Sequence, residues 1–392
     1  MKNNSKPALC ILTTVAVSIK SFYQDQIEAM NKAGIDTTII CADDAELRSF
    51  LPSETDFIPV GFKRASSPLR DLKVLWQLYK IFRKGKFDII QYSTPKASLL
   101  GSIASFAARI PLRIYILWGL YYTGQTGIKR FILKSFEKII CSLSTHIVPI
   151  AHEMVNFVES EGLAKASKCE VMLNGSACGV DLQRFDPKKW PKARAEIRDK
   201  YHIPERAVVI GAVARLTGDK GINELVSAFV EIAEEISYVH LLIVGGQEEK
   251  DKLRPETEQT IKTHPRIHAV GWQQDTIPYY MAMDIFCLPT YREGFGEVNL
   301  ESQALGLPVV STNVIGPRES IKDSETGFLV EPKSSKTIVE PLKRLILDPE
   351  LRINIGRKGR QRVEQMFRRE DVIQAMVKHR LRLLSKAYTR PT

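Results

Sequence analysis

The sequence alternates between short runs of β-branched and aliphatic residues and longer amphipathic stretches, and this alternation constrains the fold more than any other feature. In the first half it predicts a helix at residues 20–32 and strands at residues 8–13, 36–41, 87–92 and 112–117. Apolar runs of this length, separated by helical spacers, are typical of a parallel sheet that helices cover on both faces. We therefore expect an α/β protein of the doubly wound type.

The same alternation begins again after a polar, proline-containing stretch at residues 186–204. The strands expected in the second half are residues 207–214, 240–244, 266–270, 284–288 and 308–312. A chain of 392 residues is long enough for two domains of ordinary size. We expect a first domain at residues 1–185, a second at 186–368, and a C-terminal helix and tail at 369–392 that can cross back to the first domain.

Composition places the chain among ordinary globular proteins, with 44% hydrophobic and 26% charged residues. The six cysteines include no C-x-x-C pair, which argues against a disulfide framework or a thiolate zinc site and favours the cytoplasm. Neither the apolar run that follows residues 1–7 nor any later stretch has the length of a signal-peptide core or a membrane span. The net charge of +11 indicates an anionic partner, which could be nucleic acid, acidic lipid or an anionic ligand.

Chemistry is expected in the loops at the carboxyl ends of the strands, where open parallel sheets bind their ligands. The first such loop, residues 13–18, lacks the G-x-G-x-x-G fingerprint of a dinucleotide-binding domain. This absence argues against a dehydrogenase.

The segment at residues 211–221 leaves a predicted strand and opens a predicted helix, with Arg215 and Lys220 in between. A helix N-terminus offers free backbone amides, and two cations beside it would suit a diphosphate. The arginine fork and the lysine point charge could together neutralise charge on a departing phosphate. The alternative is that both are solvated surface cations.

A second segment, residues 289–308, places two carboxylates around the start of a short predicted helix. Glu293 lies in the loop before the turn at residues 294–296, and Glu301 lies about one helical turn inside the helix. The glycines of the turn let backbone amides approach a ligand, and the carboxylates are good acceptors for sugar and ribose hydroxyls. For Glu297 we favour a simpler role, a favourable interaction with the helix macrodipole.

These residues resemble the retaining glycosyltransferases of family 4, which have the two-domain GT-B fold. The spacing from Glu293 to Glu301 is similar to the E-x7-E motif of that family, and Arg215 with Lys220 resembles its Arg/Lys pair at the donor diphosphate. Residues 174–185 are similar to its interdomain N-G-x-D-x-x-F stretch, in the longer version of capsule and exopolysaccharide enzymes.

The resemblance implies a GT-B α/β fold in which two Rossmann-like domains face each other across a cleft. The first domain would bind a saccharide acceptor and the second a nucleotide-sugar, which we take to be a UDP-sugar. The reaction implied is hexosyl transfer with retention of configuration, in the biosynthesis of a bacterial surface polysaccharide such as capsule or lipopolysaccharide. We expect no cofactor and no metal, because the nucleotide-sugar is a substrate and the sequence has no D-x-D between apolar flanks.

The resemblance also assigns roles to individual residues. The catalytic residues would be Arg215, Lys220 and Glu293, with Glu293 orienting the donor sugar. The residues implied to bind the nucleotide-sugar are Gly245, Trp272, Gly294, Phe295, Gly296, Val298 and Glu301, the last of them at the ribose.

Two other readings of the whole protein remain open. One is a nucleotide-sugar epimerase or a sugar phosphorylase of the same fold, neither of which is expected to carry E-x7-E with this interdomain stretch. The other is a basic nucleic-acid-binding protein, although the sequence shows no recognition helix, zinc finger or single-strand-binding motif.

The first domain departs from the family pattern at the loops that would receive the acceptor. Ala16 and Val17 stand where the family usually has glycine, and the loop after Leu117 lacks the customary His or Arg. His146 and His152 are available, but a histidine at a strand end is more often a structural residue. The acceptor-side catalytic residues are therefore not assigned.

The positive charge concentrates between residues 63 and 138, where fifteen Lys and Arg oppose three acidic residues. Within this region residues 69–84 and 128–138 interleave cations with aromatic and aliphatic residues at helical spacing. That pattern suits an anionic membrane surface, although a helix that covers a sheet also needs an apolar stripe. We hypothesise that the first domain docks peripherally on the inner face of the cytoplasmic membrane, where an acceptor linked to polyprenyl diphosphate would meet the cleft.

Overall fold

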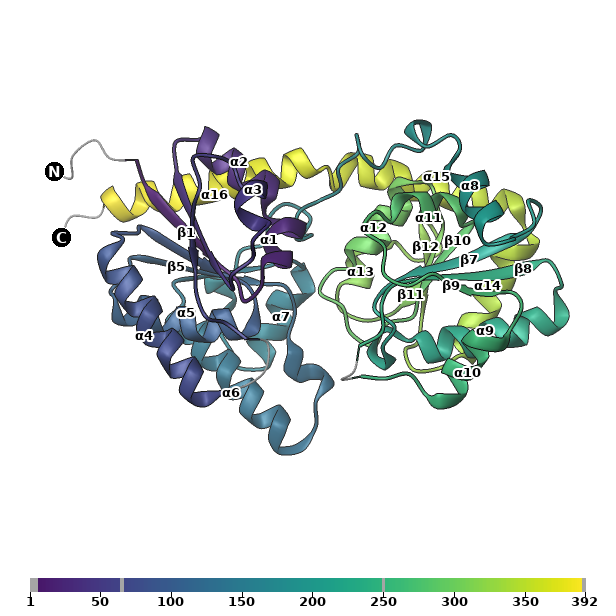
Figure 1. Ribbon diagram of the computed structural model, residues 1–392, viewed down its shortest axis with the longest axis horizontal. Coiled ribbons are helices and arrows are strands. Elements are labelled where there is room, and N and C mark those ends of the chain that lie inside the picture. The colour runs from purple at the N-terminus through teal and green to yellow at the C-terminus, as the bar shows by residue number, and fades with distance from the viewer. Residues whose placement is uncertain (1–5, 64–66, 249–250, 390–392) are drawn as a thin grey trace. The chain divides into compact units, whose positions relative to one another are not determined.

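The computed structural model describes residues 6–63, 67–248 and 251–389, and the chain forms two compact units (Figure 1). Unit 1 comprises Met1–Cys178 and Glu370–Thr392, and unit 2 comprises Gly179–Arg369. Each unit contains one six-stranded sheet in which every neighbouring pair of strands is parallel. The α/β doubly wound fold predicted from the sequence is therefore confirmed.

The sheet of unit 1 has the strand order β3-β2-β1-β4-β5-β6. Its strands are β1 (Ala8–Leu12), β2 (Asp36–Cys41), β3 (Asp56–Pro59), β4 (Ile89–Tyr92), β5 (Leu112–Leu117) and β6 (His146–Pro149). Its helices are α1 (Ala16–Phe22), α2 (Gln24–Lys32), α3 (Leu47–Phe50), α4 (Pro68–Lys84), α5 (Pro95–Ala107), α6 (Gly127–Leu143), α7 (His152–Ser160) and α16 (Arg369–Thr389), with short 3₁₀ turns at Tyr121–Gly124 and Ala166–Lys168.

Three features of unit 1 differ from the prediction. The helix expected at residues 20–32 is two helices that meet at Tyr23, whose buried ring lies 5.6 Å from the ring of Trp118. The strands β3 and β6 were not predicted. Each has only two apolar residues between a polar residue and a proline, Asp56 and Pro59 in β3 and His146 and Pro149 in β6, so no apolar run stands out.

The sheet of unit 2 has the strand order β12-β11-β10-β7-β8-β9. Its strands are β7 (Val208–Val213), β8 (Val239–Val244), β9 (Ile267–Ala269), β10 (Ile285–Leu288), β11 (Val309–Thr312) and β12 (Gly327–Val330). Its helices are α8 (Ala193–Lys200), α9 (Ile222–Glu235), α10 (Pro255–Thr263), α11 (Ile277–Ala282), α12 (Glu297–Ala304), α13 (Pro317–Ser320), α14 (Lys336–Leu347) and α15 (Pro349–Met366), with 3₁₀ turns at Pro187–Lys189 and Gly218–Lys220. Five of these strands match predicted ones, and the short β12 was not predicted.

The two sheets share one topology, because numbering the strands within each unit gives the order 3-2-1-4-5-6 in both. In this order the connections reverse direction between the first and fourth strands, and the carboxyl ends of those two strands form the usual ligand crevice. The crevice lies after β1 and β4 in unit 1 and after β7 and β10 in unit 2. The loops after β7 and β10 are the two segments that the sequence singled out.

The unit boundaries differ by a few residues from the expected ones. Residues 179–185 lie in unit 2, because the Val180 backbone pairs with the turn after α15: its amide donates to the carbonyl of Phe367 (2.8 Å), and the Arg369 amide donates to its carbonyl (3.0 Å). Helix α16 packs within unit 1. Its buried Arg380 donates to Oε1 of Gln91 on β4 at 2.7 and 3.1 Å.

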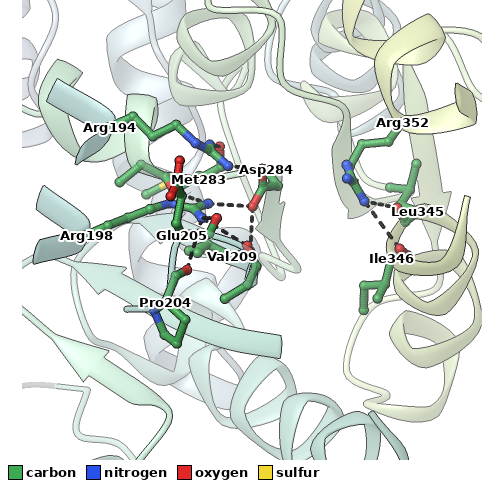
Figure 2. A network of polar contacts seen from close by, with 12 residues as sticks. Arg194, Arg198, Pro204, Glu205, Val209, Met283, Asp284, Leu345, Ile346 and Arg352 are labelled. Carbon is green, nitrogen blue, oxygen red and sulfur yellow. Dashed lines mark hydrogen bonds and ion pairs between the residues drawn. The ribbon is translucent and has the colours of Figure 1, made fainter. Parts of the chain in front are cut away.

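A buried polar network fastens α8 to the start of the sheet in unit 2 (Figure 2). Arg198, 3% exposed, donates to Oδ2 of Asp284 (2.7 Å) and to the carbonyls of Ala282 (2.9 Å) and Ala207 (3.0 Å). The same Oδ2 accepts the amide of Val209 at 2.7 Å, and Arg194 pairs with Oδ1 at 2.8 Å. This network holds the amino ends of β7 and β10, at the edge opposite the ligand crevice.

Residues 6–63, 67–248 and 251–389 contain no helix with the length and hydrophobicity that a membrane span requires.

Candidate functional site

The loops after β7 and β10 in unit 2 are bound to each other at the crevice. The amide of Tyr291 and the hydroxyl of Thr290 both donate to the carbonyl of Asp219, at 2.8 and 3.1 Å. Gly221 has a positive φ of 71°, and a Cβ at this position would lie 2.0 Å from the carbonyl oxygen of Pro289. Only glycine allows this approach, so the sequence itself sets the distance between the two loops.

The carboxylate of Asp219 joins the same two loops through side chains. Its Oδ1 accepts from the Thr217 hydroxyl at 2.6 Å, and its Oδ2 accepts from Arg292 at 2.7 Å. Burial alone would raise the pKa of Asp219, but the Thr217 hydrogen bond and the charges of Arg292, Lys220 and Arg215 outweigh burial and lower it. Asp219 is therefore an ionised anchor between the loops.

Lys220 and Glu293, predicted as catalytic residues, form an ion pair across the crevice. The Lys220 Nζ lies 2.6 Å from Oε2 of Glu293, and both side chains are largely but not fully buried. The other oxygen of Glu293 accepts the amide of Gly294 at 3.3 Å. The sequence placed these residues at separate parts of a ligand, whereas in this structure each neutralises the other.

Arg215, the third predicted catalytic residue, also has an acidic partner. Its Nη1 lies 2.6 Å from Oε2 of Glu248, in the loop after β8, and the arginine side chain is about half exposed. The same loops are joined by the Leu216 amide, which donates to the carbonyl of Gly246 at 2.8 Å. Both cations that could meet a diphosphate are thus charge-compensated here by carboxylates that a diphosphate could replace.

Helix α12 begins at the crevice, as predicted, and Gly296 is its N-cap residue with a φ of 88°. Val298 lies in the first turn of α12, where backbone amides have no partner within the helix. Phe295 differs from the expectation, because its side chain is buried against Phe367 with ring centroids 5.5 Å apart. Only the backbone of Phe295 is left to meet a ligand.

Glu301 lies one turn further along α12, in the position that the sequence predicted. Tyr280, on α11, donates its hydroxyl to Oε2 of Glu301 at 3.0 Å and fixes the carboxylate. Burial raises the pKa of Glu301, while the Tyr280 hydrogen bond and the charges of Arg184 and Arg369 act in the opposite direction.

Gly245 and Trp272 belong to neighbouring loops, after β8 and β9. The Gly245 amide donates to the carbonyl of Gly271 at 2.9 Å. The Trp272 ring is 74% exposed, which leaves an aromatic face free for stacking.

The structure therefore brings the predicted residues of unit 2 to one edge of one sheet. Sequence reasoning missed four residues that hold them there: Asp219, Glu248, Tyr280 and Arg292. Asp219 and Arg292 lie inside the two segments already quoted, so their charge was a usable signal. Glu248 and Tyr280 act across 33 and 21 residues of sequence, and no local pattern indicates such partners.

In unit 1 the loops after β1 and β4 meet through two threonines. Thr14, after β1, meets Thr94, after β4, through two contacts of 2.8 Å. His146 starts β6 and so lies at the opposite edge; its Nδ1 is 3.0 Å from the Thr145 hydroxyl, and burial lowers its pKa. His152 begins α7, with Nε2 3.0 Å from the carbonyl of Leu173. Both contacts agree with structural roles.

Within the described ranges, no group of three or more His, Cys, Asp and Glu side chains is arranged to hold a metal ion.

Comparison with known proteins defines the class of this molecule. The model of the Glycosyl transferases group 1 family matches residues 193–362, and that of the Glycosyl transferase 4-like domain matches residues 19–175. The chain is 36% identical over 357 residues to the capsular polysaccharide biosynthesis glycosyltransferase CapM of Staphylococcus aureus, covering 91% of this chain and 92% of that protein.

Two further proteins extend the comparison. The UDP-Gal:alpha-D-GlcNAc-diphosphoundecaprenol alpha-1,3-galactosyltransferase of Escherichia coli is 27% identical over 84% of each chain. The structure of Anabaena HepE in complex with UDP and glucose superposes with a TM-score of 0.77 at 19% identity, covering 95% of this chain and 99% of HepE.

A pair of doubly wound units with charged loops at one switch point is the architecture of a GT-B glycosyltransferase. The chain belongs to the group 1 glycosyltransferases, the family 4 enzymes whose motifs its sequence resembles.

Proposed function

We propose that this glycosyltransferase transfers a sugar from a UDP-sugar to a lipid-linked saccharide acceptor in the synthesis of a bacterial surface polysaccharide. The observation that carries the proposal is the Lys220–Glu293 ion pair at the crevice of unit 2, with Arg215 in the same loop. Relatives support the choice of substrates: CapM is named for capsule biosynthesis, the Escherichia coli relative for UDP-galactose and a diphosphoundecaprenol acceptor, and HepE was solved with UDP.

Donor binding is proposed to exchange one set of partners for another. The diphosphate would take the place of Glu293 beside Lys220 and of Glu248 beside Arg215, since phosphate oxygens match both cations. Glu293 would then be free to accept hydrogen bonds from hydroxyls of the donor sugar. The ribose would meet Glu301, the base would stack on Trp272, and the backbone at residues 294–298 would line the diphosphate.

The transfer step is proposed to retain configuration without a protein nucleophile. The acceptor oxygen attacks the anomeric carbon on the face from which the diphosphate leaves, the bond from that carbon to the diphosphate breaks, and a diphosphate oxygen takes the acceptor proton. Lys220 and Arg215 stabilise the charge that grows on the leaving group. These two cations and the backbone amides supply the positive charge that a metal would otherwise bring, so we propose that the reaction is metal-independent.

The acceptor determines where the enzyme works. A saccharide on polyprenyl diphosphate is held at a lipid bilayer, so the proposed place of action is the inner face of the cytoplasmic membrane, with the protein bound peripherally. The basic region of unit 1 supports this placement; Arg64, one of the fifteen basic residues between residues 63 and 138, lies outside the described residues.

A screen of the purified full chain tests the proposal. UDP-, GDP- and ADP-sugars are offered with a short-chain lipid diphosphate saccharide, with and without EDTA, and released nucleotide and product anomer are measured. We expect UDP release that depends on the acceptor, a product with the donor's anomeric configuration, and activity that survives EDTA. An inverted product, or loss of activity that Mn²⁺ restores, would overturn the corresponding part, and a free epimerised sugar nucleotide would favour an epimerase.

A further inference from the structure

Helices α4, α5 and α6 carry a concentration of exposed large apolar side chains. The three helices lie side by side on unit 1 (Figure 1), α4 against α5 and α5 against α6. Half of the exposed large hydrophobic residues in the described part of the chain belong to them: Leu69, Leu72 and Trp76 on α4, Phe106 on α5, and Ile128, Phe131, Ile132, Phe136 and Ile139 on α6.

Helix α4 has apolar residues on two opposite sides. Val74, Leu78 and Phe82 are spaced by four residues and are buried. Leu69, 87% exposed, and Trp76, 57% exposed, lie on the other side of the helix. A helix that only covers a sheet needs one apolar stripe and presents polar residues to water, so the second stripe is unexplained by folding.

A groove separates α4 from α5 on this exposed side. Its volume is about 560 Å³, and its lining includes Leu72, Trp76 and Tyr79 of α4 and Ile103 and Ala107 of α5. The groove is open and mainly apolar, which suits hydrocarbon better than a polar ligand.

Cations border the apolar stripe. Lys73, Lys80, Arg83 and Lys84 on α4 and Lys129 and Lys138 on α6 are all exposed, and Nζ of Lys80 lies 5.2 Å from the Trp76 ring centroid. Arg130 is not counted with them, because it pairs with Glu161 at 3.5 Å.

The acidic residues of these helices do not offset those cations at the surface. Asp71, the only acid of α4, is paired with Lys96 at 2.9 Å. Glu137, the only acid of α6, is buried and accepts the Tyr115 hydroxyl at 2.9 Å. The face is therefore both apolar and strongly positive.

We propose that the outer face of α4, α5 and α6 docks on an anionic lipid bilayer, with Leu69, Leu72 and Trp76 inserted among acyl chains and the cations at the headgroups. Anionic lipid complements both properties of the face at once. A second copy of the chain would set like charges against each other, and a nucleic acid would leave the apolar stripe in water. This inference extends the proposed function and rests on it, because the lipid-linked acceptor is part of that function.

Sedimentation with vesicles tests the docking. The full chain is mixed with vesicles of phosphatidylcholine alone or with added phosphatidylglycerol, at low and high salt. We expect binding to the anionic vesicles that weakens with salt, and a blue shift of tryptophan emission that Trp76→Phe removes while binding remains. The combined substitution Leu69→Ser, Leu72→Ser and Trp76→Ser should lower partition at least about tenfold, since each change removes an inserted apolar side chain.

Matched variants distinguish an effect on the docking surface from an effect on folding or on catalysis. Leu347→Ser with Ile353→Ser removes two exposed apolar residues of unit 2 and should leave partition unchanged. The triple variant should keep its melting temperature and its transfer to a saccharide acceptor without lipid.

Three outcomes would overturn the docking: equal partition of triple variant and parent, a parent dimer that the triple variant disperses without any vesicle binding, or binding to nucleic acid alone. Vesicle binding by a protein that transfers no sugar would instead refute the proposed function, while the docking proposal would stand.

Discussion

The two edges of the sheet in unit 2 carry ion pairs of the same chemical kind with different surroundings. At the amino edge, Arg198 is buried and donates to one carboxylate and several carbonyls (Figure 2). At the carboxyl edge, Lys220 and Arg215 each pair with one carboxylate among the described residues, and both are more exposed than Arg198, Lys220 partly and Arg215 about half. A buried arginine whose donors are all hydrogen-bonded within the protein is not available to a ligand. A cation with a single carboxylate partner can exchange that partner for a phosphate. The difference separates a structural charge from a functional one.

The largest expected effect comes from breaking the amino edge. Arg198→Ala would leave the Asp284 carboxylate buried with less positive charge beside it, and several carbonyls would lose their hydrogen-bond donors. We therefore expect the free energy of unfolding to fall by about 3–5 kcal/mol. Urea unfolding followed by circular dichroism measures this. Arg194→Ala, which removes the exposed partner of the same carboxylate, is the control and should cost less than about 1 kcal/mol. Equal losses in the two variants would show that burial does not distinguish these arginines.

The next effect comes from the carboxyl edge and is kinetic. Lys220→Ala should lower kcat by about 10²-fold, or about 2.7 kcal/mol of transition-state stabilisation, while unfolding free energy changes by less than about 1 kcal/mol. Initial rates of UDP release over a range of donor concentrations separate kcat from KM. Lys322→Ala, an exposed lysine of the same unit, should match the parent. A change confined to KM would contradict a role for Lys220 in the transition state.

The amino edge should also respond to acid. His240, near the start of β8, is buried beside His268 with ring centroids 5.3 Å apart, and burial, His268 and Arg266 lower the pKa of His240 to about 4. The unfolded chain binds a proton at higher pH than the folded chain, so the neutral ring stabilises the fold above pH 6.5 and this stability is lost as pH falls toward 4.

The expected loss is about 1 kcal/mol per pH unit below pH 6.5. Urea midpoints measured at pH 7, 5.5 and 4.5 should show a shallower decline for His240→Gln than for the parent. Parallel declines would mean that His240 does not stay neutral in the folded protein.

How far the sequence predicts this molecule depends on the range of each interaction. The doubly wound sheets were predictable because β1 and β7 are continuous apolar runs, and β2 and β8 are rich in β-branched and aliphatic residues, between helical stretches. The strands β3, β6 and β12 carry a weaker local signal, because each holds only two or three apolar residues in a row beside a polar residue, a proline or a glycine. Their place in the sheet is decided by tertiary pairing.

The candidate site follows the same rule. Two continuous segments hold the predicted charged residues at fixed offsets: Arg215 and Lys220 in one, Glu293 and Glu301 in the other. Their place after two strands could therefore be predicted from the sequence. The Lys220–Glu293 pairing spans 73 residues and was not predicted, because it depends on how two strand ends meet. The buried side chain of Phe295 was missed for a related reason: its contact, Phe367, lies far along the chain.

The smallest expected effect sharpens the comparison at the carboxyl edge, where Glu301 is fixed by a neutral hydroxyl instead of a cation. A ribose contact is made equally in the ground state and the transition state, so Glu301→Ala should weaken UDP binding about tenfold, or about 1.4 kcal/mol, without a further loss in kcat. Isothermal titration with UDP measures the affinity. Glu297→Ala, one turn earlier on α12, should leave it unchanged, because a carboxylate in the first turn acts mainly on the helix dipole. If UDP binds the Glu301 variant as tightly as the parent, the carboxylate does not hold the ribose and its role reduces to the Tyr280 contact.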